Sequence, residues 1–231
     1  YSDINFILLA EIVRRVSGED FETYTRSKIF EPLAMRDTYF RPPASLQPRI
    51  APSEKLTDGT FLRGVAHDPT TRFMGGVAGH AGLFSTGDDL SYFAEMMLGE
   101  GRFGPGSRVL NALSVLAMTT PQSPHGQPIL RGFGWDIDSP YSSPRGDLFP
   151  IGSYGHTGFT GTSLWIDPVT KTYVLLLTSH LHSDPSTSVV SLRGRLANIV
   201  ATSLEQLPVN RIHGISSQAC VESADILQQP V

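Results

Sequence analysis

The sequence predicts a mixed α/β fold in which an antiparallel sheet is flanked by helices and joined to a helical subdomain. Up to about residue 130, apolar residues recur at the spacing of amphipathic helices. Beyond that point they gather in short runs typical of strands, and a last segment returns to the helical spacing. We therefore expect one domain over residues 1–204, mainly helical over 1–130, with a sheet and a C-terminal helix over 131–204. A polar tail or linker is expected over residues 205–231.

The composition limits the classes of function. A chain of 231 residues with 40% hydrophobic residues can bury a core, and its net charge of −4 gives no support for nucleic-acid binding. No apolar run approaches the ~20 residues that span a bilayer. Cys220 is the single cysteine, so an intrachain disulfide and a Cys-x-x-Cys motif are both excluded.

The first predicted helix lies directly after residue 3. Ile4, Leu8, Ile12 and Val16 recur every four residues and form one apolar stripe. Gly18 is a plausible end, because glycine readily adopts the backbone conformation that closes a helix.

A second, short helix is expected around Phe21, Tyr24 and Ile29, ending before Pro32. Residues 41–64 are rich in proline, serine and glycine, which predicts an irregular segment.

Two further helices have recognisable first residues. Thr86, followed by Asp89, is typical of a helix N-cap, and Gly99 is expected to end that helix. Asn111 is expected to cap the next helix. Residues 75–82, which precede the first of these helices, are rich in glycine.

Strands are predicted at residues 133–137, 159–166 and 172–179, the last two joined by a turn at 167–171. Pro185 is expected to open a final helix. The residues expected on the inward face of that helix are Val189, Leu192, Leu196, Ile199 and Val200.

Two short motifs stand far apart in this framework. Tyr1-Ser2-Asp3 opens the sequence, and Tyr154-Gly155-His156-Thr157-Gly158-Phe159 comes late in it. Together they resemble two of the three active-site motifs of the serine β-lactamase and penicillin-binding-protein superfamily. The separation of Tyr1 from His156 and the segments 29–35 and 81–86 are similar to the class C β-lactamase branch. The segments 65–69 and 79–82 resemble a cell-wall amidase and esterase subgroup.

The resemblance implies a β-lactamase-like fold and an acyl-serine mechanism, in which Tyr1 shares the proton of the nucleophile. A free phenol has a pKa near ~10, so this role needs cationic neighbours. The alternative is a frayed terminal tyrosine. Asp3 stands where the family usually has asparagine, and an ionised carboxylate only accepts hydrogen bonds. It is expected to hold a lysine or to repel an anionic substrate, and the alternative is a helix cap.

His156 replaces the lysine of the usual Lys-Thr-Gly motif, and the resemblance makes it the second candidate catalytic residue. It can donate a proton or contact a substrate carboxylate, since imidazole titrates near neutrality. Thr157 would offer a hydroxyl, Gly158 would let a substrate approach the backbone, and the N–H of Phe159 would be an oxyanion donor. The alternative is a turn entering a strand.

His67 and His80 are further candidates for substrate contact, with a structural hydrogen bond as the alternative for each. His180 and His182 lack an acidic partner at a diagnostic spacing, so we expect no metal site. The resemblance implies no cofactor.

The third family motif, Ser-x-x-Lys, does not occur. The chain has three lysines, and none has a serine three residues before it. A Gly-x-Ser-x-Gly motif is also absent. We therefore expect an N-terminally truncated chain that lacks the nucleophile helix and the N-terminal strands, with residues 174–177 on an unpaired sheet edge.

The resemblance thus predicts a serine hydrolase of amide or ester bonds. Cell-wall peptides are the first substrate expected, β-lactam or ester-like molecules the next, and this fragment alone is expected to be inactive. Alternatives are a non-catalytic ligand-binding remnant and one chain of a split enzyme. The expected partner is a small molecule or muropeptide, with no nucleic acid and no transmembrane segment, and the family suggests a periplasmic or extracytoplasmic location.

Overall fold

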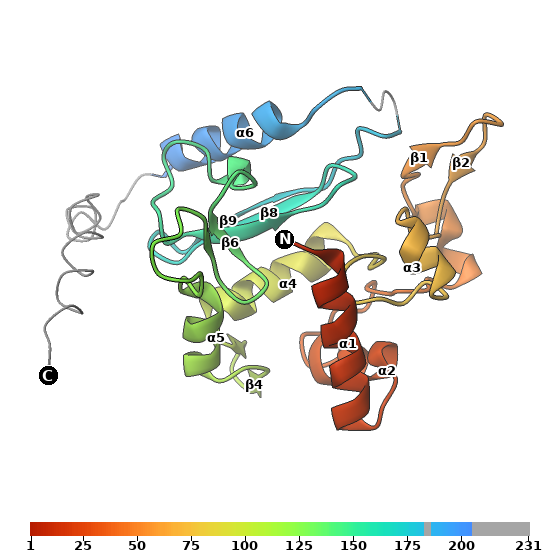
Figure 1. Ribbon diagram of the computed structural model, residues 1–231, viewed down its shortest axis with the longest axis horizontal. Helices are drawn as coiled ribbons and strands as arrows, with labels where there is room; N and C mark the ends of the chain where they lie inside the picture. Colours follow the sequence, from red (N-terminus) through yellow and green to blue (C-terminus); the bar gives the residue numbers. More distant parts are fainter. Residues whose placement is uncertain (183–185, 205–231) are drawn as a thin grey trace, which may run out of the picture. The chain divides into compact units, whose positions relative to one another are not determined.

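The computed structural model describes residues 1–182 and 186–204 and divides them into two compact units (Figure 1). Unit 1 comprises Tyr1–Leu116, Gly158–Thr162 and Leu175–Val189. Unit 2 comprises Ala117–Thr157, Ser163–Val174 and the chain from Val190 onward. The division at residue 130 into a helical and a sheet region stays a prediction, and the tail over residues 205–231 lies outside the described residues.

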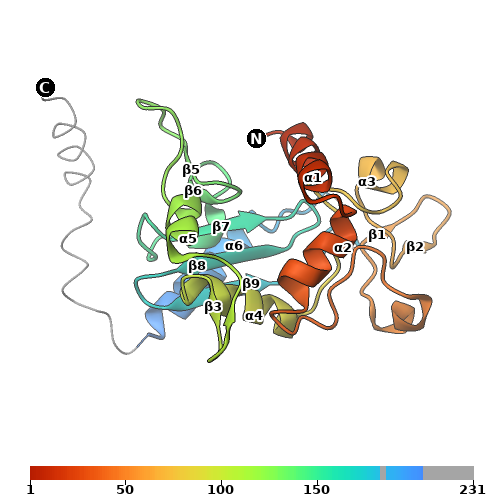
Figure 2. The ribbon, with the colours of Figure 1, turned by 90° about the horizontal axis from the view of Figure 1, so that it is seen from below.

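The main sheet has five strands in the order β5-β6-β7-β8-β9, and the paired strands from β5 to β8 run antiparallel. Together with the helices of the two units, this sheet confirms the predicted α/β class with an antiparallel sheet. Figure 2 shows β7, β8 and β9 side by side. The strand bounds are β5 Leu130–Arg131, β6 Asp136–Asp138, β7 Tyr154–Thr157, β8 Ser163–Asp167 and β9 Thr172–Leu176.

The strand predicted at residues 159–166 begins later than expected. β8 starts at Ser163, because the preceding residues form the turn that joins it to β7. The amide of Gly158 donates to the Thr162 carbonyl at 2.8 Å, and that of Gly161 donates to the Gly158 carbonyl at 3.1 Å. Gly161 has φ +135°, a backbone conformation that residues with a Cβ atom rarely adopt.

The predicted turn between β8 and β9 is present. Asp167, 1% exposed, accepts hydrogen bonds from the Val169 amide and from the amide and hydroxyl of Thr170. Lys171 then adopts φ +56°. One buried carboxylate therefore fixes the tight connection.

The core of unit 2 includes side chains of the sheet strands themselves. Trp165 is 1% exposed, and its indole N–H donates to the Ser153 hydroxyl at 2.9 Å. Trp135 and Tyr154 pack edge to face with ring centroids 5.1 Å apart. Burial of this aromatic set gives the β7 strand a rigid support.

The last helix, α6 (Val190–Thr202), runs along the sheet of unit 2 (Figure 1). Ala197 is fully buried against Phe149 and Val174, with Leu196 and Val200 packed on that cluster as predicted. The inward placement predicted for Leu192 and Ile199 is wrong, since both are exposed. The buried side of the helix instead includes Arg193, and Pro185 lies outside the described residues.

The other helices and small hairpins follow the chain. They are α1 Asp3–Ser17, α2 Phe21–Thr25, the π-helical turn Arg26–Phe30, the 3-10 turn Ala44–Arg49, α3 Pro69–Phe73, α4 Gly87–Leu98, α5 Ala112–Thr119 and the 3-10 turn Ser143–Arg145. Two antiparallel pairs, β1 Glu54–Lys55 with β2 Phe61–Leu62 and β3 Arg102–Phe103 with β4 Ser107–Arg108, form small hairpins.

Three of the predicted helix ends agree with the structure. Gly18 closes α1 in the left-handed conformation at φ +74°. The Thr86 hydroxyl accepts from the amide of Asp89 at 3.2 Å at the start of α4. Asn111 accepts from the amide of Leu113 at 2.9 Å before α5. These contacts join residues at most three positions apart, which explains why the sequence reveals them.

The apolar stripe of α1 is exposed in the structure, although α1 packs against α2 (Figure 2). Ile4, Leu8, Ile12 and Val16 have exposed fractions of 64%, 55%, 54% and 83%. α1 contributes no buried residue. The amphipathic pattern thus predicted the helix correctly, while its apolar stripe faces solvent.

Candidate functional site

Strand β7 carries His156 and Thr157 in the centre of the sheet. It pairs with β8 in the register Gly155 with Trp165 and His156 with Leu164. A Cβ atom on Gly155 would collide with the Trp165 indole and the Leu164 carbonyl. Glycine at this position therefore allows the two strands to pair over the buried indole. The pairing fixes the position of the next residue, His156.

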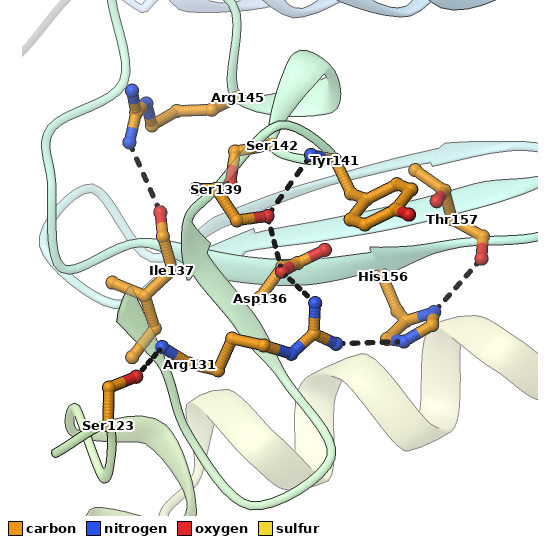
Figure 3. A network of polar contacts seen from close by, with 10 residues as sticks. All are labelled: Ser123, Arg131, Asp136, Ile137, Ser139, Tyr141, Ser142, Arg145, His156 and Thr157. Carbon is orange, nitrogen blue, oxygen red and sulfur yellow. Dashed lines mark hydrogen bonds and ion pairs between the residues drawn. The ribbon is translucent and has the colours of Figure 1, made fainter. Parts of the chain in front are cut away.

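Both ring nitrogens of His156 have neighbours (Figure 3). Nδ1 lies 2.9 Å from the Thr157 carbonyl oxygen, and Nε2 lies 3.4 Å from Nη2 of Arg131. Burial is the largest influence on this imidazole and lowers its pKa below the usual value, while the hydrogen bond with the Thr157 carbonyl and then the nearby Asp136 oppose the shift. At neutral pH this places His156 on the uncharged side of its titration.

Arg131 and Asp136 are functional candidates that the sequence motifs did not reveal. Nη1 of Arg131 pairs with Oδ1 of Asp136, which also accepts from the Ser139 hydroxyl at 2.7 Å (Figure 3). Asp136 is 1% exposed, and its Oδ2 has no hydrogen-bond partner among the described residues. One feature of the sequence could have indicated Asp136, because it is an acidic residue inside the predicted strand 133–137. A buried acidic side chain needs a partner.

The turn after β7 carries Gly158 and Phe159. A Cβ atom on Gly158 would collide with the Thr162 hydroxyl, so glycine is needed for the turn itself. The Phe159 ring is 79% exposed and stacks on His67 with ring centroids 5.7 Å apart. Phe159 and His67, predicted separately, are thus neighbours in unit 1. Nε2 of His67 also lies 3.4 Å from a carboxylate oxygen of Glu54.

His80 lies in a second polar cluster of unit 1. Its side chain is 2% exposed, and Nε2 is 2.9 Å from Oδ1 of Asp68. The same carboxylate oxygen accepts from the Thr71 amide at 2.6 Å and so caps α3. His80 therefore connects the glycine-rich segment 75–82 to the start of that helix. Substrate contact by His80 stays a prediction.

Tyr1 and Asp3 stand at the start of α1 in unit 1. The Tyr1 ring is 61% exposed and lies against Phe6, with centroids 5.6 Å apart. The N-cap is Ser2, which makes no side-chain capping bond, and Asp3 is the acidic residue of the first turn. Asp3 can thus interact favourably with the positive end of the helix dipole without acting as the cap.

The predicted residues divide between the two units. Unit 1 contains six of them, which are Tyr1, Asp3, His67, His80, Gly158 and Phe159, and unit 2 contains His156 and Thr157. Among residues 1–182 and 186–204, no three histidine, cysteine or acidic side chains form a group able to hold a metal ion. Cys220 lies outside the described residues.

Solved structures define the class of the fold. A beta-lactamase from Mycobacterium bovis is 25% identical with a TM-score of 0.60, and the match covers 87% of this chain and 63% of that one. A beta-lactamase/D-alanine carboxypeptidase from Pseudomonas syringae is 17% identical with a TM-score of 0.64, covering 89% and 60%. The chain therefore has the β-lactamase and penicillin-binding-protein fold, as the resemblance implied.

Sequence comparison gives the family. The model of the Beta-lactamase family matches residues 1–198, and the chain belongs to that family. A protein of Escherichia coli named "Putative D-alanyl-D-alanine carboxypeptidase" is 32% identical over 201 residues, 79% of this chain and 45% of the relative. One of the same name from Salmonella schwarzengrund is 31% identical over 231 residues, 93% of this chain and 52% of the relative. The chain spans about half the length of these curated relatives.

Proposed function

We propose that this chain is the part of a serine hydrolase that carries the tyrosine and His-Thr-Gly motifs and cleaves amide or ester bonds through an acyl-serine intermediate. The observation that carries the proposal is the position of His156 and Thr157 on a central strand of a sheet with the family's fold. A sheet strand supported by buried aromatic side chains holds catalytic groups more rigidly than a loop.

Each motif residue receives a role in this proposal. Tyr1 accepts the proton of the nucleophile, and Asp3 orients the cation beside it. His156 and Thr157 bind the substrate along β7, and the N–H of Phe159 stabilises the developing oxyanion. Gly158 keeps the turn close to Thr162, so that the backbone beyond β7 stays in place.

The nucleophile is proposed to come from a Ser-x-x-Lys on another segment, since the chain itself contains none. A longer form of the same chain is the first source, and a second polypeptide is the other. The coverage of only 45% of the Escherichia coli relative is compatible with either. Without that segment we propose that the chain is inactive.

Cell-wall peptides ending in D-alanine are the proposed substrates, and β-lactams and small esters the next. The names of the curated relatives support this order. The place of action is proposed to be periplasmic or extracytoplasmic, where such peptides are found. In the described part of the chain, no helix has the length and apolar character needed to cross a bilayer.

The second candidate is a ligand-binding remnant without chemistry. The absence of Ser-x-x-Lys from these 231 residues favours it. It differs from the first candidate in one measurable respect. A remnant would form no acyl-enzyme even as part of a longer chain, whereas a hydrolase would.

Covalent labelling by a fluorescent penicillin separates the two. We expect no label on the 231-residue chain, and one label per molecule on a longer form that includes a Ser-x-x-Lys. Loss of that label when the motif serine becomes alanine confirms the site. Labelling of the 231-residue chain would refute the placement of the nucleophile, and an unlabelled longer form would favour the remnant.

Hydrolysis of a peptide ending in D-Ala-D-Ala by the longer form tests the role of β7. His156→Gln is expected to lower kcat/KM by about 100-fold, the size typical of a lost acid, base or positioning group. His125→Gln is the matched control, because His125 is an exposed histidine of a loop in the same unit. Equal activity of the two variants would argue against a role for His156.

A further inference from the structure

The neighbours of His156 determine where its proton lies. The Thr157 carbonyl oxygen can only accept a hydrogen bond, so Nδ1, 2.9 Å away, must carry the hydrogen. The Arg131 guanidinium can only donate, so Nε2, 3.4 Å away, must offer its lone pair. Both contacts are satisfied at once by the uncharged ring with hydrogen on Nδ1 (Figure 3).

Arg131 is itself held in place. Its side chain is 20% exposed and pairs with Asp136, whose side chain is 1% exposed. The Ser139 hydroxyl donates to the same carboxylate oxygen at 2.7 Å. A buried carboxylate thus keeps the guanidinium directed at the imidazole, since leaving either charge without the other would be costly.

The charges that face His156 act in opposite directions. Burial disfavours the imidazolium most, the hydrogen bond with the Thr157 carbonyl and then Asp136 favour it, and Arg131 disfavours it. Together these influences hold the pKa of His156 below the ordinary value. The geometry and the electrostatics therefore agree on an uncharged ring at neutral pH.

We propose that Arg131 is a positioning residue for His156 and fixes its ring as the tautomer protonated on Nδ1. Nε2 then stays a hydrogen-bond acceptor, and the cation beside β7 is the guanidinium rather than an imidazolium. The catalytic meaning rests on the proposed function, whereas the tautomer does not. An imidazolium would lose its charge as pH rises through the usual histidine range, but a guanidinium keeps it. The charges that the Arg131–Asp136 ion pair places beside this strand are then independent of pH around neutrality.

Nitrogen-15 NMR of the histidine side chains in the 231-residue chain tests the proposal directly. The His156→Gln variant assigns the signals of His156. At pH 7 we expect a protonated-type shift for Nδ1 and an unprotonated-type shift for Nε2, with a titration midpoint below the ordinary histidine value. A ring protonated on Nε2, or charged, at pH 7 would overturn the proposal before Arg131 is changed.

Arg131→Gln tests the source of the effect. Without the guanidinium, Arg131 no longer opposes the influence of Asp136 on the imidazole, so the titration midpoint of His156 is expected to rise. Arg145→Gln is the matched control, because Arg145 is also 20% exposed and pairs with a β6 carboxylate, that of Asp138, at 2.8 Å. Equal midpoints in Arg131→Gln and the unchanged chain would overturn the proposal, as would an equal rise in the control.

The double variant Arg131→Gln with Asp136→Asn serves if the single variant does not fold, since it leaves no buried charge unpaired. Loss of the guanidinium donor to Nε2 is expected to move the nitrogen shifts toward a larger share of the Nε2-protonated tautomer, because only the Thr157 carbonyl then favours hydrogen on Nδ1. Shifts identical to those of the unchanged chain would overturn the proposal. None of these spectra depends on turnover, so a failure of the proposed function, seen by penicillin labelling, is distinguishable from a failure of this inference.

Discussion

Replacement of Asp136 by alanine tests the network that supports β7. Asp136 is buried, and it accepts hydrogen bonds from Arg131 and from the Ser139 hydroxyl. Removing the carboxylate takes the buried negative charge away from a guanidinium that is only 20% exposed. Asp138 offers the comparison, since it lies on the same strand and also pairs with an arginine, but its side chain is 36% exposed.

The expected cost follows from the two contacts. A hydrogen bond to a charged group contributes about 1.5–3 kcal/mol, and the serine bond adds about 1 kcal/mol. Asp136→Ala should therefore lower the free energy of unfolding by about 3 kcal/mol, in the range known for a broken buried ion pair. The pair of Asp138 is more exposed to solvent, and exposed pairs contribute at most about 1 kcal/mol, so Asp138→Ala should cost less than Asp136→Ala.

Urea unfolding of the 231-residue chain, followed by tryptophan fluorescence, measures both values. Trp135 and Trp165 are both buried in unit 2, so the signal reports on the unit that contains the network. Equal unfolding midpoints for Asp136→Ala and Asp138→Ala would refute the view that burial makes the first pair the important one.

Three further predictions concern other parts of the structure. Gly155→Ala forces a methyl group into the neighbouring indole and should lower the free energy of unfolding by about 2 kcal/mol. Gly106→Ala is the control, because open space surrounds that position and its melting temperature should not change. Equal melting temperatures for the two variants would contradict the predicted collision. His156 has a lowered pKa in the folded state, so the unfolded chain binds its proton first and stability should fall as pH drops below about 6.5. The slope is at most about 1.4 kcal/mol per pH unit, and urea unfolding at several pH values should show it reduced in His156→Gln; an unchanged slope would be evidence against it. The exposed stripe of α1 should make the chain self-associate, and analytical ultracentrifugation should show less association after Leu8→Lys with Ile12→Lys; a monomer at high concentration before the change would exclude this.

The candidate site was only partly predictable from the sequence. The motif residues His156 and Thr157 were found because the family motif consists of residues that are adjacent in the sequence. Arg131 was not, because it meets His156 across 25 residues of sequence. Such a contact exists only after β5, β6 and β7 have paired in one register, and nothing in the local sequence specifies that register.

The sequence by itself determined the helix ends, the β8–β9 turn and the fold class. Gly18, Thr86 and Asp167 act on residues at most four positions away, so short-range chemistry suffices. Tertiary structure decided the rest. It left the apolar stripe of α1 exposed and turned the expected strand at residue 159 into a turn, because burial and pairing depend on which distant segments meet. It also decided the charge of His156, because burial and the contacts with Arg131 and Asp136 arise only when the strands assemble.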